Sequence, residues 1–285
     1  MTPIATALAD AEARLTAAGV PSPRADAELL VGHVLGLGRG AVLARAVAGG
    51  LLDDGDVAAL RDAVERRASR EPLQHITGVA HFRGLSLAVG PGVFVPRPET
   101  ELVAQHAIDL LSAVPGPRPR AVDLGTGSGA LALALATEVP HSVVWAVEKS
   151  PAAFVWAKLN ARAAGADNVR LIHADLADAL PELDGTIDLV VSNPPYIPIG
   201  AVPRDPEVRL YDPELALYGG EDGLDVVRDL ESTARRLLRP GGALVIEHGE
   251  QQGGAIAALL AGRGWRAIAT HPDLLGRPRA TTAVR

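Results

Sequence analysis

The chain has 285 residues, of which 48% are hydrophobic and 21% are charged, a composition that supports a sizeable core and excludes a disordered protein. The formal net charge of -7 disfavours long DNA or RNA as a partner, because nucleic-acid binders usually carry an excess of basic residues. The absence of cysteine excludes disulfides, thiolate metal sites and a cysteine nucleophile.

The first 70 residues are predicted to form a helical-bundle domain. Residues 5–17 are rich in Ala and Leu, a second helix begins at Pro23 behind a Ser22 cap, and a third runs from an Asp53 or Asp54 cap to near Ser69. No strand-like alternation is evident in this part. The N-terminus lacks the basic start and apolar run of a signal peptide, and the apolar stretches are too short to span a membrane. We therefore expect a cytoplasmic protein.

Residues 71–96 are predicted to link two domains through a β-hairpin. Gly78, Gly84 and Gly90 punctuate short apolar runs at residues 85–89 and 93–95. Two short strands joined by a turn account for this pattern.

Residues 97–285 are predicted to form a doubly wound α/β domain, because strand and helix patterns alternate along them. The last two strands have no helix between them and should form an antiparallel edge pair. The expected helices are 102–113, 131–138, 151–164, 222–238 and 253–261, and the expected strands are 121–124, 142–147, 169–173, 187–192, 242–247, 265–270 and 279–284.

A glycine-rich turn follows the first of these strands. In Asp123-Leu124-Gly125-Thr126-Gly127-Ser128-Gly129, the glycines allow a sharp turn and the close approach of a ligand. Glu148 ends the next strand, where its carboxylate can accept hydrogen bonds from the ribose hydroxyls of an adenosine-containing ligand. The turn alone leaves NAD and S-adenosylmethionine equally open, because it also fits the dinucleotide pattern.

Two features favour S-adenosylmethionine. Asp123 can receive the positively charged amino group of the methionine part. Asp175 and Leu176, at the end of the third strand, can offer an acceptor for the adenine amino group and an apolar wall for its ring. An Asp at a strand end is equally often a helix cap, so both roles stay open for Asp175.

The tetrapeptide Asn193-Pro194-Pro195-Tyr196 follows the buried strand 187–192 and should lie in the same crevice. The two prolines stiffen the loop and remove two N–H donors. The Asn193 side-chain oxygen and the Pro194 carbonyl can then accept both hydrogens of one NH2 group, with the Tyr196 ring beside it. This arrangement suits methylation of an amide or amino nitrogen whose lone pair is delocalised into a π-system.

Taken together, these motifs resemble the bacterial release factor N5-glutamine methyltransferases, over nearly the whole chain. The resemblance implies a seven-stranded, Rossmann-like class I methyltransferase sheet behind an N-terminal helical domain that docks release factors. It implies S-adenosylmethionine held by Gly125–Gly129, Glu148 and Leu176, and a glutamine amide held by residues 193–196, with Phe94 walling the pocket. Asn193 is implied to contact both the cofactor and the substrate. Further matching segments are Arg24-Ala25-Asp26-Ala27-Glu28-Leu29-Leu30, Glu71-Pro72-Leu73-Gln74-His75-Ile76-Thr77-Gly78, Pro96-Arg97-Pro98-Glu99-Thr100-Glu101 and Gly219-Gly220-Glu221-Asp222-Gly223-Leu224.

Other interpretations remain open. A DNA adenine N6-methyltransferase presents the same chemistry to the loop, although the net charge of -7 disfavours it. A nucleotide-binding oxidoreductase or a non-catalytic cofactor-binding module would need no Asn193. We expect no metal site, because the histidines are scattered, and a monomer, because no exposed heptad is evident. The arginines Arg61, Arg66, Arg67 and Arg70 form either a solvated face balanced by Asp62 and Glu65 or a docking surface for an acidic partner.

Overall fold

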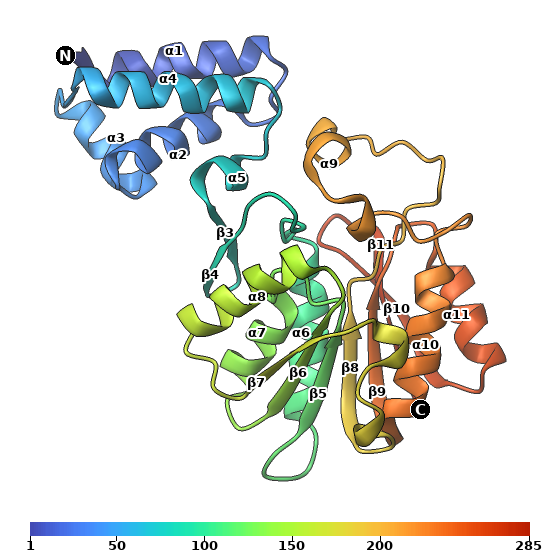
Figure 1. The fold of residues 1–285 in the computed structure, drawn as a ribbon. Coiled ribbons are helices and arrows are strands. Elements are labelled where there is room, and N and C mark those ends of the chain that lie inside the picture. The colour runs from blue at the N-terminus through green and yellow to red at the C-terminus, as the bar shows by residue number, and fades with distance from the viewer. The chain divides into compact units, whose positions relative to one another are not determined.

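The computed structural model describes all residues and divides the chain into two compact units (Figure 1). The first unit contains Met1–Val79 and, in addition, Arg204–Tyr211. The second contains Ala80–Pro203 and Asp212–Arg285. The helical unit thus runs past residue 70, and it includes a segment that the sequence pattern assigned to the α/β domain.

The first unit is built from helices, as expected. Asp53 caps α4 through a reciprocal pair of hydrogen bonds with Asp56. Helices α3, α5 and α9 were not predicted, because each is too short to show a clear helical period. The expectation of no strands was wrong in detail, since two-residue strands β1 (Thr2–Pro3) and β2 (Leu51–Leu52) pair antiparallel. The helices are α1 (Ile4–Ala17), α2 (Pro23–Leu35), α3 (Arg39–Val47), α4 (Asp54–Ala68), α5 (Leu73–Thr77) and α9 (Pro206–Tyr211).

The arginine cluster of α4 and its C-terminal end divides: Arg61 and Arg66 are exposed, as expected of a solvated face, whereas Arg67 and Arg70 are not. Arg67 is buried, with its guanidinium 2.7 Å from Asp26 and 2.9 Å from Glu207. Arg70 lies 2.6 Å from the same Glu207 carboxylate. Arg66 pairs with Glu71, and Glu65 pairs with Arg14 rather than with the cluster. Buried charges require such partners, so Arg67 and Arg70 anchor α9 to α4 instead of forming an open basic surface.

The predicted hairpin exists, and the apolar run at residues 85–89 forms its second strand rather than its first. It consists of β3 (Val79–Phe82) and β4 (Leu85–Ala88), and residues 93–95 form no strand. Arg83 adopts a positive φ of 51° at the turn. Its backbone N–H donates to Glu101 at 2.9 Å, and its guanidinium binds Glu138 and Gln105. The hairpin is therefore fixed within the second unit by the helices that carry Glu101, Gln105 and Glu138.

The second unit contains the expected seven-stranded sheet, in the order β10-β11-β9-β8-β5-β6-β7. The strands from β9 to β7 in this order are parallel. The last two strands are antiparallel, as predicted, with β11 inserted between β9 and β10. The strands are β5 (Arg120–Leu124), β6 (Val143–Glu148), β7 (Val169–His173), β8 (Ile187–Ser192), β9 (Leu238–Glu247), β10 (Arg266–Pro272) and β11 (Pro278–Val284).

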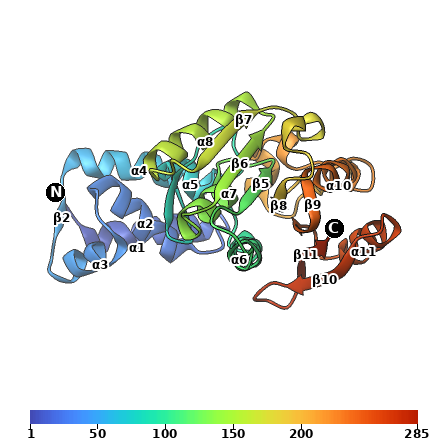
Figure 2. The same ribbon diagram turned by 90° about the horizontal axis from the view of Figure 1, so that it is seen from below.

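Helices cover both faces of the sheet (Figures 1 and 2). Alternate strand residues divide between two cores: Ala121 packs with α6 and α7, whereas Val122 packs with α10 and α11. No single helix is long and apolar enough to cross a membrane, although the bent pair α2 and α3 passes by length and composition alone. The bounds are α6 (Thr100–Ser112), α7 (Ala130–Glu138), α8 (Pro151–Ala163), α10 (Asp225–Leu237) and α11 (Gly253–Gly262), with 3-10 turns η1 (Leu176–Asp178), η2 (Pro181–Leu183) and η3 (Glu214–Ala216).

Candidate active site

The carboxyl ends of four neighbouring parallel strands bring the candidate residues together. Asp123 is the penultimate residue of β5, Glu148 ends β6, Asn193 follows β8 and Glu247 ends β9. Ligands of open α/β sheets bind at this edge, where the strand order reverses. The reversal here lies between β5 and β8, directly beneath the glycine turn and the Asn193 loop.

The glycine turn is tied to β6. The backbone N–H groups of Gly125 and Thr126 both donate to the Val147 carbonyl at 2.9 Å. Gly125 and Gly127 have positive φ angles of 77° and 58°, which only glycine adopts without strain. A Cβ built on either residue would meet no atom within 4 Å. The turn therefore presents bare backbone to open space, as a cradle for a ligand requires.

Glu148 holds this turn as well as facing the crevice. Its Oε2 accepts from the Gly127 N–H at 2.8 Å and its Oε1 accepts from the Ser150 N–H at 2.7 Å. A carboxylate offers about four acceptor positions, so each oxygen retains one for a ribose hydroxyl. The sequence suggested only the ribose role. The structure adds a backbone role, which fixes the carboxylate before any ligand binds.

Asp123 is buried, with one oxygen bonded and one free. Its Oδ2 accepts from the Thr126 hydroxyl at 2.6 Å and from the Ala132 N–H at 3.1 Å, whereas Oδ1 has no partner. Burial, and to a lesser degree the nearby Glu148 charge, raise the pKa of Asp123 to about 7. An unpartnered buried carboxylate oxygen fits a cationic group, so the predicted contact with the amino group of S-adenosylmethionine agrees with the geometry.

We expect Asp123→Asn to weaken cofactor binding about 10- to 100-fold, because a charge-assisted hydrogen bond contributes about 1.5–3 kcal/mol. In the unaltered protein, affinity should rise as pH increases through about 7, since the cation binds the ionised carboxylate. The variant should lose this pH dependence. Titration calorimetry at about pH 6 and about pH 8 measures both effects. Equal cofactor affinities of the two proteins at high pH would show that Asp123 does not contact the cofactor.

Asp175 and Leu176 lie where the sequence placed them, after β7. Asp175 Oδ1 accepts from the Ala177 N–H at 3.1 Å, and the carboxylate lies 2.7 Å from Lys149 Nζ. These contacts are those of a cap for η1, the second of the two roles considered for this residue. Leu176 packs against the core shared by α10 and α11. Their adenine contacts stay a prediction.

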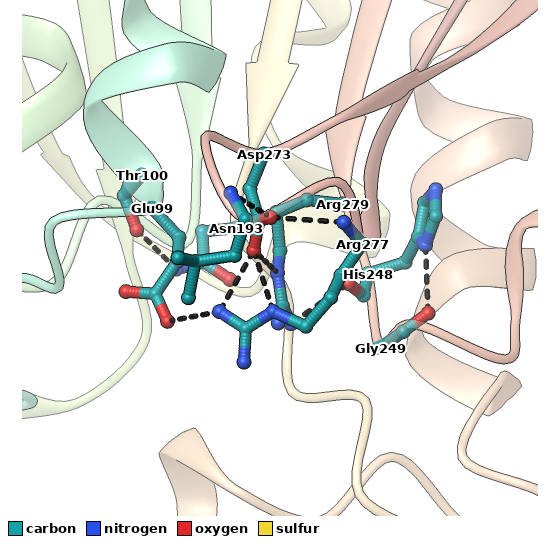
Figure 3. Close-up of polar contacts among 9 residues, drawn as sticks. Glu99, Thr100, Asn193, His248, Gly249, Asp273, Arg277 and Arg279 are labelled. Carbon is teal, nitrogen blue, oxygen red and sulfur yellow. Dashed lines mark hydrogen bonds and ion pairs between the residues drawn. The ribbon is translucent and has the colours of Figure 1, made fainter.

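The loop formed by residues 193–196 is fixed at both ends. The Ser192 hydroxyl donates to the Leu124 carbonyl at 2.6 Å, which joins the loop to the glycine turn. Asn193 Nδ2 donates to the Thr100 hydroxyl at 3.4 Å (Figure 3). Neither the Asn193 side-chain oxygen nor the Pro194 carbonyl accepts a hydrogen bond from the chain. Both predicted acceptors are thus free for a substrate NH2 group.

A second loop supports the first from behind. The Ile197 N–H donates to the Leu217 carbonyl at 2.8 Å, and the Gly219 N–H donates to the Ile197 carbonyl at 2.9 Å. Gln252 Nε2 donates to the Tyr196 carbonyl at 2.9 Å. The glycine-rich segment 219–224, noted in the sequence only as part of the resemblance, therefore supports the Asn193 loop.

Sequence reasoning missed Asn160, which connects the hairpin to the glycine turn. Its amide bonds both the N–H and the C=O of Ala88, at 2.7 and 3.0 Å, and donates to the Ser128 carbonyl at 2.9 Å. The signal was present in α8, where Asn160 continues the buried face of Ala153 and Ala157 at helical spacing. A polar residue on a buried face requires hydrogen-bond partners.

Phe94 lies in the loop that precedes α6 and is half-buried, whereas Val93 and Val95 on either side are fully buried in a separate core. The Arg97 guanidinium lies 4.9 Å from the centre of its ring. Phe94 thus points away from the core of its neighbours. Its place in the methyl-transfer pocket stays a prediction.

Comparison with known proteins agrees with this geometry. The family model "PrmC N-terminal domain" matches residues 6–78 and "Methyltransferase small domain" matches residues 91–202. The release factor glutamine methyltransferase of Streptomyces coelicolor is 52% identical, over 97% of this chain and 96% of that protein. A 4-amino-L-phenylalanine/4-methylamino-L-phenylalanine methyltransferase of Streptomyces pristinaespiralis is 43% identical, over 94% and 91%.

Among solved structures, the methyltransferase domain of METTL16 has a TM-score of 0.52 and 18% identity, over 70% of this chain and 88% of that one. At this identity the likeness supports the fold alone. The fold predicted from the sequence is confirmed, and the protein is a methyltransferase that uses S-adenosylmethionine. The chain belongs to the family of release factor glutamine methyltransferases.

Proposed function

We propose that the protein methylates the side-chain amide nitrogen of the glutamine in the Gly-Gly-Gln loop of translation release factors. The observation that carries the chemistry is the pair of free acceptors, Asn193 Oδ1 and the Pro194 carbonyl, on a stiff loop beside the glycine turn. The near full-length identity to release factor methyltransferases supports the choice of substrate.

The residues of the loop address one chemical difficulty. The lone pair of an amide nitrogen is delocalised into its carbonyl, so the nitrogen is a poor nucleophile. Two acceptors on its hydrogens orient the nitrogen and increase its electron density, and correct orientation supplies much of the rate. When bound, S-adenosylmethionine supplies an electrophilic methyl carbon on a sulfonium. No strong base is needed before attack, because the proton can leave afterwards.

The rest of the chain is assigned by the same proposal. The glycine turn, Glu148 and Asp123 hold the cofactor, and the helical unit docks the release factor. The protein acts in the cytoplasm as a monomer, with neither DNA nor a membrane as a partner.

A second candidate substrate is a small aromatic amine. The relative from Streptomyces pristinaespiralis acts, by its name, on 4-amino-L-phenylalanine and is 43% identical, as are several of the release factor enzymes. An aniline NH2 shares its lone pair with a ring and suits the same two acceptors. The acceptor pair alone does not separate the two substrates.

The test is incubation with methyl-labelled S-adenosylmethionine and, in separate reactions, a release factor, 4-amino-L-phenylalanine and duplex DNA. We expect label on the release factor, located by mass spectrometry on the peptide that contains Gly-Gly-Gln. A release factor with that glutamine replaced is the matched control. Label on the amino acid alone or on the DNA alone would identify that molecule as the substrate in place of the release factor. Label on none of the three would reject the proposed function.

Glu148→Ala should raise the apparent dissociation constant of the cofactor about tenfold while reducing turnover at saturating cofactor much less. The variant loses a charge-assisted acceptor for the ribose as well as the bond to the Gly127 N–H. Equilibrium binding and initial rates at saturating cofactor separate the two effects. Unchanged binding would show that the carboxylate serves the turn only.

A further inference from the structure

Glu247 is a buried carboxylate for which the reaction described so far has no use. It ends β9, which runs parallel to β8 with Ile246 opposite Ser192, so Glu247 and Asn193 leave the sheet as neighbours. Its residue is only 2% exposed, and its Oε2 has no hydrogen-bond partner. Burying an ionisable group with an unpartnered oxygen lowers the stability of the fold. This destabilisation points to a functional role for Glu247 beside Asn193.

The surroundings of Glu247 contain both donors and charges. Burial is the largest influence and raises the pKa of Glu247 to about 7. The polar side chains of Thr100 and Asn193 and the positive charge of Arg279 lower this pKa, whereas the charge of Glu99 raises it. Burial raises the pKa of Tyr196, and the charge of Glu247 raises it further.

The charged neighbours are themselves held in place. Arg279 Nη1 donates to the His248 carbonyl at 3.3 Å, and Arg277 lies 2.8 Å from Asp273 and 3.4 Å from Glu99 (Figure 3). Thus α6, the Asn193 loop and β11 all direct charged or polar groups at the end of β9. Glu247 is the only group in this set that buries an unpartnered oxygen beside Asn193.

An asparagine amide has an acceptor at one end and a donor at the other, and only one orientation serves the substrate. An ionised carboxylate accepts hydrogen bonds and cannot donate them. Asn193 Nδ2 donates to the Thr100 hydroxyl and the Asn193 amide interacts with Glu247, whereas Oδ1 accepts no hydrogen bond from the chain. The negative charge behind Nδ2 also polarises the amide and strengthens Oδ1 as an acceptor.

We propose that Glu247 is a positioning residue, which fixes the orientation of the Asn193 amide so that its oxygen receives the substrate N–H. The inference rests on the proposed function of Asn193. A protonated Glu247 can donate a hydrogen bond to Asn193 Oδ1. The Asn193 amide can then rotate by about 180°, so that its oxygen no longer receives the substrate N–H. Activity should therefore increase with pH as the Glu247 carboxyl ionises.

The experiment is the pH profile of kcat for the unaltered protein and for Glu247→Gln, with release factor as substrate. The unaltered protein should show an acid limb near pH 7. Glu247→Gln should lower kcat about tenfold and remove that limb, because glutamine does not ionise and can either donate or accept. The cofactor dissociation constant should not change. The thermal unfolding midpoint at high pH should not fall, since the variant removes a buried charge.

Glu231→Gln is the matched control. Glu231 is also buried, at 1% exposed, and accepts from Trp265 Nε1 at 2.7 Å on the opposite side of the sheet from α6. This variant should keep both kcat and the acid limb. If Glu247→Gln does not fold, Thr100→Val replaces it: the loss of the hydroxyl should lower kcat and leave the acid limb.

The outcomes are separable. An unaltered protein that does not methylate release factor rejects the proposed function. An active protein whose kcat does not depend on pH near 7, or a Glu247→Gln variant with unchanged kcat and profile, rejects the positioning role alone.

Discussion

Asn193→Ala is expected to reduce kcat about 100- to 1,000-fold, the usual loss when one preorganised hydrogen-bonding group of a transition state is removed. The variant removes Oδ1, one of the two free acceptors, while the Ser192 hydroxyl still ties the strand end to the Leu124 carbonyl. Cofactor affinity should change much less, because binding energy realised only in the transition state raises kcat rather than affinity.

Single-turnover rates at saturating cofactor, together with calorimetric binding of the cofactor, measure the two quantities. Asn168→Ala is the control. Asn168 precedes β7, away from the crevice, and its amide donates to the Ala136 carbonyl at 3.0 Å. The Asn168→Ala variant should be less stable than the unaltered protein but should have the same rate. Equal losses of rate and cofactor affinity in Asn193→Ala would mean that Asn193 is mainly structural.

Gly219→Ala should reduce kcat about 100-fold, the effect of a misplacement of about 1 Å in a catalytic group. A Cβ at Gly219 would lie 2.5 Å from the Pro195 carbonyl oxygen and 2.7 Å from the Gly223 carbonyl oxygen. Both distances are shorter than the 3.4 Å at which ordinary van der Waals contact begins. Both contacts are with backbone, so no side chain can rotate to relieve them. The strain must move either the supporting loop or residues 193–196.

Gly254→Ala provides the comparison. A Cβ there meets nothing within 4 Å, and the residue lies in α11, so alanine should stabilise the protein by up to about 1 kcal/mol. Its kcat should be unaltered. If Gly219→Ala folds with the same kcat as the unaltered protein, the glycine-rich segment does not determine the position of the Asn193 loop.

The α/β sheet could be predicted well from the sequence because its signals are local and strong. Residues 187–192 match β8, since a buried parallel strand reads as a nearly continuous apolar run. Residues 169–173 match β7, an edge strand that contains three apolar residues and is only partly buried. The glycine turn and the Asn193 loop were found for a similar reason: each is a contiguous motif directly after a strand. Parallel topology then places them at one edge.

The errors and omissions involve contacts between distant parts of the chain. Glu207 binds Arg67 and Arg70 across almost half of the sequence, so no local pattern shows that these arginines have a partner. Glu247 reads as the polar end of an apolar strand, and only the neighbouring β8 shows what it faces. In the hairpin, the turn at Arg83 rather than the glycine at 90 sets the strands.

The segment 204–211 has a consequence for how this protein can be divided. The polypeptide passes between its two units at residues 79–80, 203–204 and 211–212, and the last two passages come after the Asn193 loop in the chain. Removing the N-terminal residues would therefore leave α9 in the shortened chain, with the Glu207 carboxylate deprived of both arginines. A single cut in the chain therefore does not separate the α/β unit from the helical unit. Exchanging the helical unit between relatives requires α9 to be exchanged with it.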